Sequence, residues 1–351
     1  MPQTKTLRWA MVIAVPVLAL LLLSLVGCER KVTGTVQTGD VVSDKCFTCH
    51  NGTMDAMQGE WANSIHASGA SVDYTSRDGS DCSKCHNQDG FIDWITTGVL
   101  ADSYGNAKAI GCFACHDPHE TGNFSLRSMA AVTLADGTTF DFEEGNLCAN
   151  CHQARRVGSS VGANTNVSSS HWGPHHGPQG DLLAGAGGYE GFTGYSKESS
   201  IGHQMLDGSC TYCHMSYANT HDGYNVGGHS FNMEFDGYNV SLVCRDCHGE
   251  IGSRGSPYTV ITDSVDYDGD TVIEGFQVEV EGLMDSLAVL LKAEGVLSSG
   301  GSPVVQVIAD GDLAGALFNY LMVEEDRSEG VHNPKYIISL LEASIAYVSS
   351  L

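Results

Sequence analysis

The sequence predicts a mainly α-helical protein with extensive irregular loops and a separate helical segment at its C-terminal end. Between residues 46 and 248 the pattern Cys-x-x-Cys-His occurs six times, and the chain around it is rich in Gly, Ser, Asn and Asp. These residues favour turns over long regular elements. After residue 248 there is no further cysteine, and apolar side chains recur with the period of an α-helix.

The first 27 residues have the character of an export signal. Lys5 and Arg8 form a short basic region, and the almost continuously apolar segment 9–26 leads into the sequence LVGC, which ends at Cys28. This ending resembles the lipobox of bacterial lipoproteins, which implies a lipid anchor on Cys28. Glu29, in place of an aspartate, favours the outer membrane. The alternative is an uncleaved membrane helix, because about 18 apolar residues are close to the minimum that spans a bilayer.

The chain is strongly acidic, with a formal net charge of -25. Removal of residues 1–27 would take away two basic residues and no acid, so the mature chain would be more acidic still. Nucleic acid is excluded as a partner, because phosphate binding requires a basic surface. The acidic surface keeps the protein soluble and favours positively charged partners.

Cysteine usage indicates the cofactor. Of the 13 cysteines, all except Cys28 belong to the six motifs. Two cysteine sulfurs in this motif form thioethers with one haem, and the following histidine binds its iron. On one helical turn, positions i, i+3 and i+4 share a face and can reach one flat cofactor. The motifs, numbered 1 to 6 in chain order, are Cys46/Cys49/His50, Cys82/Cys85/His86, Cys112/Cys115/His116, Cys148/Cys151/His152, Cys210/Cys213/His214 and Cys244/Cys247/His248.

Two other uses of cysteine compete with haem attachment, namely disulfide bonds and zinc sites. Neither explains why a histidine directly follows every pair, and thioethers would use up the cysteines that disulfides need. The sequence therefore predicts six haems c. Covalent attachment by this motif takes place outside the cytoplasm in bacteria, in agreement with the export signal.

The spacing of the motifs indicates three regions. Most successive motifs start only 30 to 36 residues apart, so the segments between them are too short to bury cores of their own. We therefore expect stacked haems to form the interior of residues 28–249. Residues 1–27 would be the signal peptide, and residues 250–351 a C-terminal helical region. The longer interval between motifs 4 and 5 contains a Gly- and Pro-rich stretch, 168–178, which predicts an irregular loop.

Three helices are expected in the C-terminal region. Apolar residues with helical spacing predict the first from about residue 274 to 297 and the second over 312–323. The third should run from Pro334, with Asn333 as N-cap, to about Val348. These helices could pack together or form a subunit contact.

The sixth ligand of each iron separates an electron carrier from an enzyme, because a haem closed on both faces cannot bind substrate. Histidine is favoured over methionine because spare histidines are plentiful. A Met/His haem, the alternative, would have a higher potential. Nine histidines lie outside the motifs, namely His66, His119, His171, His175, His176, His203, His221, His229 and His332. Each of them could instead be an ordinary surface histidine.

On these motifs, the chain resembles the multihaem c-type cytochromes of metal-reducing bacteria, which include outer-surface and filament-forming proteins. The resemblance covers nearly all of the mature chain, although loosely outside the motifs. It implies distal ligands at His66, in the segment WANSIHA, and at His119, which follows motif 3 as CHDPH. It also implies His203, His229 and His332, and from the cluster 171–176 we select His175.

The segments GGHSF around His229 and GVHNP around His332 resemble ammonia-forming nitrite reductase. That family typically attaches its catalytic haem through Cys-x-x-Cys-Lys, which leaves the iron open. No such motif occurs here, which favours a carrier over an enzyme, although some related reductases lack the lysine.

An acidic turn raises the question of calcium. Asp266, Asp268 and Asp270, followed by Glu274, alternate as calcium ligands do. Thr271, however, stands where an EF-hand loop requires glycine. A solvated acidic turn that caps the next helix is the alternative.

The principal functional hypothesis is electron transfer along six closely packed, mostly bis-His haems, in extracellular or periplasmic respiration. Partners would be other cytochromes or redox proteins and a terminal acceptor, with the protein lipid-anchored at the outer membrane or cell surface, or on the periplasmic side. The alternatives are a reductase of nitrogen or sulfur oxyanions with one open haem, and a subunit of a cytochrome filament or other oligomer. A role of the histidines in pH sensing or metal buffering is more remote.

Overall fold

The computed structural model describes residues 52–67, 81–104, 108–121, 123–216, 219–221, 224–235, 238–240, 243–249 and 265–351. The predicted signal segment, Cys28 and motif 1 with Cys46, Cys49 and His50 lie outside the described residues, as does residue 250, where the C-terminal region was expected to start. All described residues belong to one compact unit that spans Gly52–Leu351.

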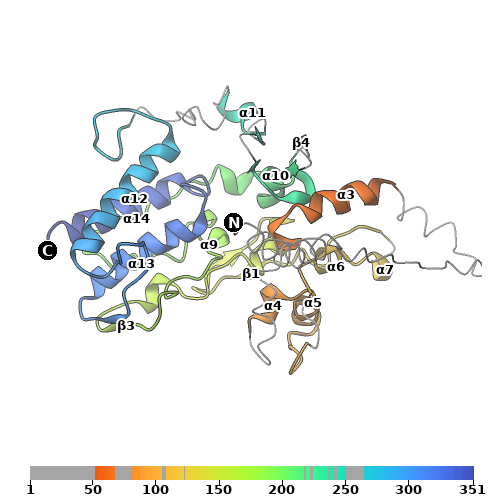
Figure 1. Cartoon of the computed structure of the whole chain (residues 1–351), viewed down its shortest axis with the longest axis horizontal. Coiled ribbons are helices and arrows are strands. Elements are labelled where there is room, and N and C mark those ends of the chain that lie inside the picture. The colour runs from red at the N-terminus through yellow and green to blue at the C-terminus, as the bar shows by residue number, and fades with distance from the viewer. Residues whose placement is uncertain are drawn as a thin grey trace, which may run out of the picture. The chain divides into compact units, whose positions relative to one another are not determined.

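The described chain is mainly helical, with many irregular connections and four two-stranded sheets, which confirms the predicted fold class (Figure 1). Its α-helices are α3 (Gly52–Ala62), α4 (Ser83–His86), α5 (Gln88–Thr97), α6 (Cys112–Cys115), α7 (Pro118–Thr121), α8 (Gly145–Ala149), α9 (Gln179–Leu183), α10 (Cys210–His214), α11 (Arg245–His248), α12 (Phe276–Ala293), α13 (Gly311–Asp326) and α14 (Pro334–Val348). Single 3₁₀ turns are η1 (Ile65–Ala67), η3 (Gly158–Ser160), η4 (His203–Met205) and η5 (Gly228–Ser230).

The strands are short, and each pairs with one neighbour in antiparallel fashion. The pairs are β1 (Val132–Thr133) with β2 (Thr139–Phe140), β3 (Thr165–Val167) with β8 (Gln306–Ile308), β4 (Asn219–His221) with β5 (Tyr224–Val226), and β6 (Glu234–Phe235) with β7 (Tyr238–Asn239). Three of these sheets are local hairpins. The pair β3–β8, with Thr165 opposite Ile308, joins the motif region to the C-terminal region.

The C-terminal helices agree with the expected positions. Helix α14 starts at Pro334, and the Asn333 side chain accepts a hydrogen bond from the Tyr336 N–H at 3.4 Å. Helix α13 has its own cap, because Asp310 accepts from the N–H groups of Asp312 and Leu313. Both caps satisfy N–H groups that the first helical turn leaves unpaired. The first helix, α12, is shorter than predicted at both ends.

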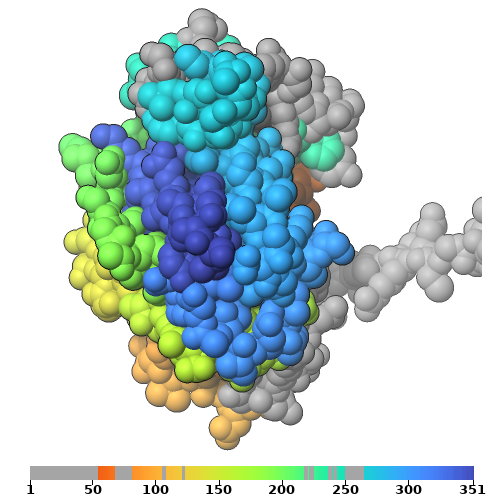
Figure 2. All heavy atoms as spheres, turned by 90° about the vertical axis from the view of Figure 1, so that its left-hand side faces the viewer, coloured from red at the N-terminus to blue at the C-terminus, as the bar shows by residue number. Residues whose placement is uncertain are grey.

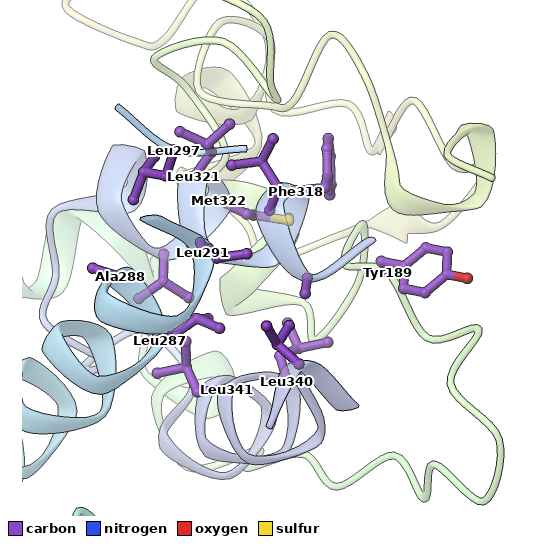
Figure 3. Packing of buried hydrophobic residues seen from close by; sticks show 14 of the residues in the cluster. Tyr189, Leu287, Ala288, Leu291, Leu297, Phe318, Leu321, Met322, Leu340 and Leu341 are labelled. Atoms are coloured by element: carbon purple, nitrogen blue, oxygen red, sulfur yellow. The ribbon is translucent and has the colours of Figure 1, made fainter. Parts of the chain in front are cut away.

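The three helices pack against one another and form the largest hydrophobic core of the described chain. Figure 2 shows the C-terminal residues, in dark blue, packed against the neighbouring blue segments. Leu287, Leu291, Phe318, Met322 and Leu340 lie between the helices and are 0% exposed (Figure 3). Each buried side chain of this size contributes roughly 1.5 to 3 kcal/mol. Of the two expected alternatives, the helices therefore pack together within the chain.

The same core holds the long interval between motifs 4 and 5. Asn319 of α13 is fully buried and forms two hydrogen bonds with the backbone of Tyr189, at 2.7 and 3.0 Å. Trp172 packs edge-on against Phe318 at 6.0 Å. Residues 168–178 form turns and bends with no regular element, as expected. The helical region thus acts as a platform that positions this loop and its histidines.

The motif region has only small apolar clusters among its described residues. One contains Phe91, Ala114 and Leu147, which come from the segments of motifs 2, 3 and 4, and the other lies around Phe140 and Leu183. Because these clusters are small, the motif segments depend on one another and on further groups for an interior. None of the helices in the described part of the chain combines the length and the apolar character that crossing a bilayer would need.

Candidate haem-binding sites

Motifs 2 to 6 each form one short helical turn, on α4, α6, α8, α10 and α11. In four of them the N–H of the histidine donates to the carbonyl of the first cysteine, at 2.9 to 3.0 Å. This i, i+4 bond brings both cysteines and the histidine to one side of the turn. All ten described motif cysteines are free of disulfide bonds.

Two of these cysteines are more exposed to solvent than the others. Cys112 of motif 3 and Cys247 of motif 6 are exposed, whereas the other eight described motif cysteines are partly buried. Cys115 of motif 3 lies near Cys151 of motif 4, and Cys244 of motif 6 lies near Cys213 of motif 5. Haem attachment at Cys112 and Cys247 stays a prediction, with the attached edge at the surface.

Each of the five motif histidines faces a histidine from outside the motifs. The ring centroids are 6.0 Å apart for His86–His175, 6.4 Å for His116–His229, 6.0 Å for His66–His152, 6.4 Å for His214–His332 and 6.1 Å for His203–His248. The partners come from distant parts of the chain. Five of the six distal ligands expected from the sequence are therefore brought opposite a motif histidine, each opposite a different one.

These separations fit one iron between two imidazoles. A histidine nitrogen binds a metal ion at about 2 Å. A five-membered ring with bonds of about 1.3 Å has a radius of roughly 1.1 Å. Two such rings on opposite sides of a metal therefore have centroids about 6 Å apart. The five spacings therefore leave room for one ion between the two rings of each pair.

Most of these imidazoles are held in the neutral form that a metal ligand requires. Burial and the nearby His152 and His214 lower the pKa of His66 to about 4. Burial and the nearby Arg155 lower the pKa of His175 to about 4. Burial also lowers the pKa of His86, His152 and His214.

The Nδ1 atoms of several ligand candidates are already engaged, which leaves Nε2 for a metal. His116 Nδ1 lies 2.8 Å from the Phe124 carbonyl, His214 Nδ1 lies 3.1 Å from that of Phe231 and His203 Nδ1 lies 2.6 Å from that of Val331. In His152 the neighbour is the Gln179 side-chain oxygen at 3.2 Å, and in His332 it is the Asp326 carboxylate at 2.6 Å.

Neighbouring motifs touch through their cysteines. The Sγ of Cys85, in motif 2, lies 3.9 Å from the carbonyl oxygen of Asn150, and that of Cys151, in motif 4, lies 3.7 Å from the carbonyl oxygen of Lys84. The thiols of Cys148 and Cys210, from motifs 4 and 5, are close enough to shift each other's pKa, that of Cys148 upward and that of Cys210 downward. Burial and then the nearby Cys244 of motif 6 raise the pKa of Cys213 to about 12.

Motif 3 also adjoins motif 4. Cys115 is close enough to raise the pKa of Cys151, although the hydrogen bond with Cys85 and burial contribute more. Phe231 lies between His66 and His229, with ring centroids at 5.0 and 6.3 Å. Motif 4 therefore adjoins motifs 2, 3 and 5, and motif 5 adjoins motif 6.

The remaining histidines are placed differently. His119, the sixth expected distal ligand, packs against Phe113 at 5.6 Å, and His50 of motif 1 lies outside the described residues. His176 pairs with the Glu325 carboxylate, and His171 is exposed. Within the cluster 171–176, His175 is thus the residue that faces a motif histidine.

The acidic turn departs from the expected calcium set. Carboxylate oxygens of Asp266, Asp268 and Glu279 lie within 4.8 Å of one another, and Asp270 is not in this group. Glu279 accepts hydrogen bonds from three backbone N–H groups, those of Glu274, Tyr267 and Asp268. The carboxylate is thus used by the turn itself, which fits the alternative of an acidic cap before α12. Calcium binding stays a prediction.

Two residues beside the imidazole pairs had no signal in the sequence. Asp326 was counted only among the surface acids, and Phe231 was only part of a ligand segment. Both lie next to ligand candidates through contacts between segments far apart in the chain, which no short motif encodes.

Comparison with known proteins gives distant matches to multihaem cytochromes. No family model matches the chain. It is 24% identical to the C-type polyheme cytochrome OmcB of Geobacter sulfurreducens, in both the DL-1/KN400 and the PCA strains. The match covers 56% of this chain and 38% of OmcB, so the chain spans well under half the length of these relatives.

Two solved structures are similar. The outer cell wall cytochrome OcwA matches with a TM-score of 0.51 and 19% identity, over 83% of this chain and 50% of OcwA. A weaker likeness, with a TM-score of 0.48 and 17% identity over 83% and 40% of the two chains, connects it to an undecaheme cytochrome from the S-layer of Carboxydothermus ferrireducens. The chain therefore has a multihaem cytochrome fold.

Proposed function

We propose that this protein is an exported multihaem c-type cytochrome that transfers electrons through six bis-His haems c. The observation that carries the proposal is the set of five imidazole pairs with centroids 6.0 to 6.4 Å apart, each beside a Cys-x-x-Cys turn. Similarity to OmcB and the fold shared with OcwA support the same cofactor class.

Each part of a site has a separate role. Cysteine pairs of the six motifs would hold the porphyrins covalently, and the motif histidines would be proximal ligands. The distal ligands would be His175, His229, His66, His332 and His203 for motifs 2 to 6 in order, leaving His119 for His50 of motif 1. A bound haem would supply the one-electron Fe(III)/Fe(II) couple.

The contacts between motifs support a branched path for electrons. Motif 4 has neighbours in motifs 2, 3 and 5, while motif 6 is reached through motif 5. The exposed thiols of Cys112 and Cys247 would put the haem edges of motifs 3 and 6 at the surface, where electrons can enter or leave. Partners are proposed to be cationic redox proteins and an extracellular or periplasmic acceptor, since the chain is strongly acidic.

The competing functions now depend on motif 1. A reductase needs an iron with one open side. A filament could be joined by a histidine that binds the iron of a neighbouring chain. Motifs 2 to 6 each face a second imidazole of the same chain. We propose that a site open to substrate, or completed by another chain, would be that of His50, with His119 not bound to its iron.

The test is the haem content and spin state of the exported protein. We expect its intact mass to include six haems, and its ferric spectrum to be wholly low-spin and unchanged by nitrite or cyanide. A mass without haem would refute the cytochrome proposal. A high-spin fraction that binds cyanide would refute six closed sites. If the wild type is wholly low-spin, one high-spin haem in His119→Ala would show that His119 is a distal ligand.

The lipid anchor is proposed from the sequence around Cys28. We expect the intact mass of the exported protein to lack residues 1–27 and to include lipid on Cys28. If residues 1–27 are still present and no lipid is attached, the lipoprotein proposal is wrong and the apolar segment 9–26 would be the anchor.

A further inference from the structure

Among the ligand candidates, His332 has an unusual neighbour. Its Nδ1 lies 2.6 Å from Oδ1 of Asp326, whose side chain is 0% exposed. Asp326 is the last residue of α13, and His332 lies just before the start of α14. The tight connection between them contains Arg327, Glu329 and Gly330 in left-handed conformation, with φ of 58°, 52° and 90°. This turn folds His332 back over the carboxylate.

The pair is fixed by further hydrogen bonds. The Ser328 hydroxyl donates to Oδ2 of Asp326, and the N–H of His332 donates to the same hydroxyl at 3.3 Å. Asn333, the next residue, is fully buried and its side chain contacts Ser199, Ser200 and the Leu183 carbonyl. The histidine and the carboxylate are therefore both held by the fold, and neither can easily turn away.

Other sites offer weaker acceptors. His116, His203 and His214 face backbone carbonyls, and His152 faces the neutral amide of Gln179. His229 has a carboxylate nearby, but its Nδ1 is 3.5 Å from Glu60, which is partly exposed. Glu60 also accepts from the backbone N–H of His229 at 2.9 Å. Among the contacts of the described residues in motifs 3 to 6, His332 alone combines a buried carboxylate with a short Nδ1 contact.

An anionic acceptor changes the imidazole as a ligand. A carboxylate that accepts a hydrogen bond from Nδ1–H makes the ring more basic and more electron-donating towards a metal on Nε2. It also places a negative charge near the iron in a buried region, where Coulomb interactions are weakly screened. Both effects stabilise Fe(III) relative to Fe(II). The redox step is the gain of one electron from a donor protein, with no bond formed or broken.

We propose that Asp326 is a tuning residue that, through His332, gives the motif 5 haem the lowest reduction potential among motifs 3 to 6. The inference rests on the proposed haem ligation. With the lowest potential, the motif 5 haem would be the last of these four to be reduced. Motif 5 also lies between motifs 4 and 6. Electrons would then occupy the haems around motif 4 and the haem of motif 6 before that of motif 5. The motif 5 haem would be an energetic step between them.

The test is a potentiometric titration of the haem-loaded full chain, followed by visible absorption and by electron paramagnetic resonance. In Asp326→Asn, which keeps the shape of the side chain and removes its charge, we expect the most negative step to move to a more positive potential. Glu324→Gln is the matched control, because this exposed acid on the same helix removes one charge without touching a ligand. Its titration should match that of the wild type.

A second variant tests the opposite direction. Ser328→Ala removes a hydrogen bond that withdraws charge from the carboxylate, so the same step should become more negative. This variant also serves if Asp326→Asn fails to incorporate six haems. The inference is overturned if variants with six low-spin haems titrate as the wild type does, or if both shift in the same direction. Absence of haem from the wild-type protein would instead refute the proposed function.

Discussion

Replacement of the buried Asp181 by asparagine should remove a dependence of stability on pH. Asp181 lies on α9, and its side chain is fully buried. Its Oδ2 accepts a hydrogen bond from the Ala154 N–H at 2.6 Å, and its Oδ1 has no partner among the described residues. Burial raises the pKa of this carboxyl from 3.8 to about 7, although the Ala154 hydrogen bond opposes the shift and Asp136 and Asp326 add to it.

The sign follows from proton binding. Below pH 3.8 the group is protonated in both the folded and the unfolded chain, so its contribution to stability is fully present. As the pH rises towards 7, the folded chain keeps a proton that the unfolded chain releases, and the free energy of unfolding falls. Each unit of pKa difference corresponds to about 1.4 kcal/mol. Between about pH 5 and pH 8 this group should therefore cost the folded protein roughly 3 kcal/mol.

The measurement is denaturant unfolding of the haem-loaded protein at these two pH values, followed by far-UV circular dichroism. Asp181→Asn should lose less stability than the wild type between the lower and the higher pH. Asp285→Asn, at an exposed position on α12, controls for the removal of one negative charge and should keep the wild-type difference. If Asp181→Asn shows the same difference as the wild type, the carboxyl is not protonated at the lower pH in the way that its burial requires.

Three further outcomes test the core, the ligands and the surface. Leu287→Ala should lower the free energy of unfolding by about 2 to 5 kcal/mol because it leaves a cavity between α12 and α14, while Val289→Ala, at a position that is 66% exposed, should change it little. An equal effect of the two in denaturant unfolding would contradict the packing described here. His66→Ala should make one of six ferric haems high-spin and able to bind cyanide, while His171→Ala should not, and a wholly low-spin His66→Ala protein would argue against this ligand. Reduction by a cationic redox protein should slow as ionic strength rises in stopped-flow measurements, because the chain has a net charge of -25, and a rate independent of salt would exclude electrostatic steering.

Local features of the fold were predicted well from the sequence. A Cys-x-x-Cys-His turn needs only five consecutive residues, and its i, i+4 hydrogen bond is present in motifs 2, 3, 4 and 6. The start of α14 was predicted at Pro334, because a cap and a first-turn proline act on adjacent residues. The prediction of the two ends of α12 was less accurate. Its N-cap, Gly275, has no side chain to cap the helix, and apolar spacing alone does not define an end.

Non-local features were not predictable to the same degree. The sequence offered nine spare histidines, and resemblance selected six, but nothing in the chain states which motif each one faces. His214 and His332, or His116 and His229, meet only after the intervening segments have folded. The motifs likewise give no sign of which cysteine is exposed, as Cys247 is.

The amino-acid sequence by itself determined six attachment motifs, a supply of histidines larger than six irons would need, and three C-terminal helices, because each depends on residues close together in the chain. Only the tertiary structure decided which imidazoles face each other, which motifs adjoin and which carboxylate lies behind a ligand. These relations depend on packing between segments brought together by the core of α12, α13 and α14, and packing of that kind leaves no pattern over neighbouring residues.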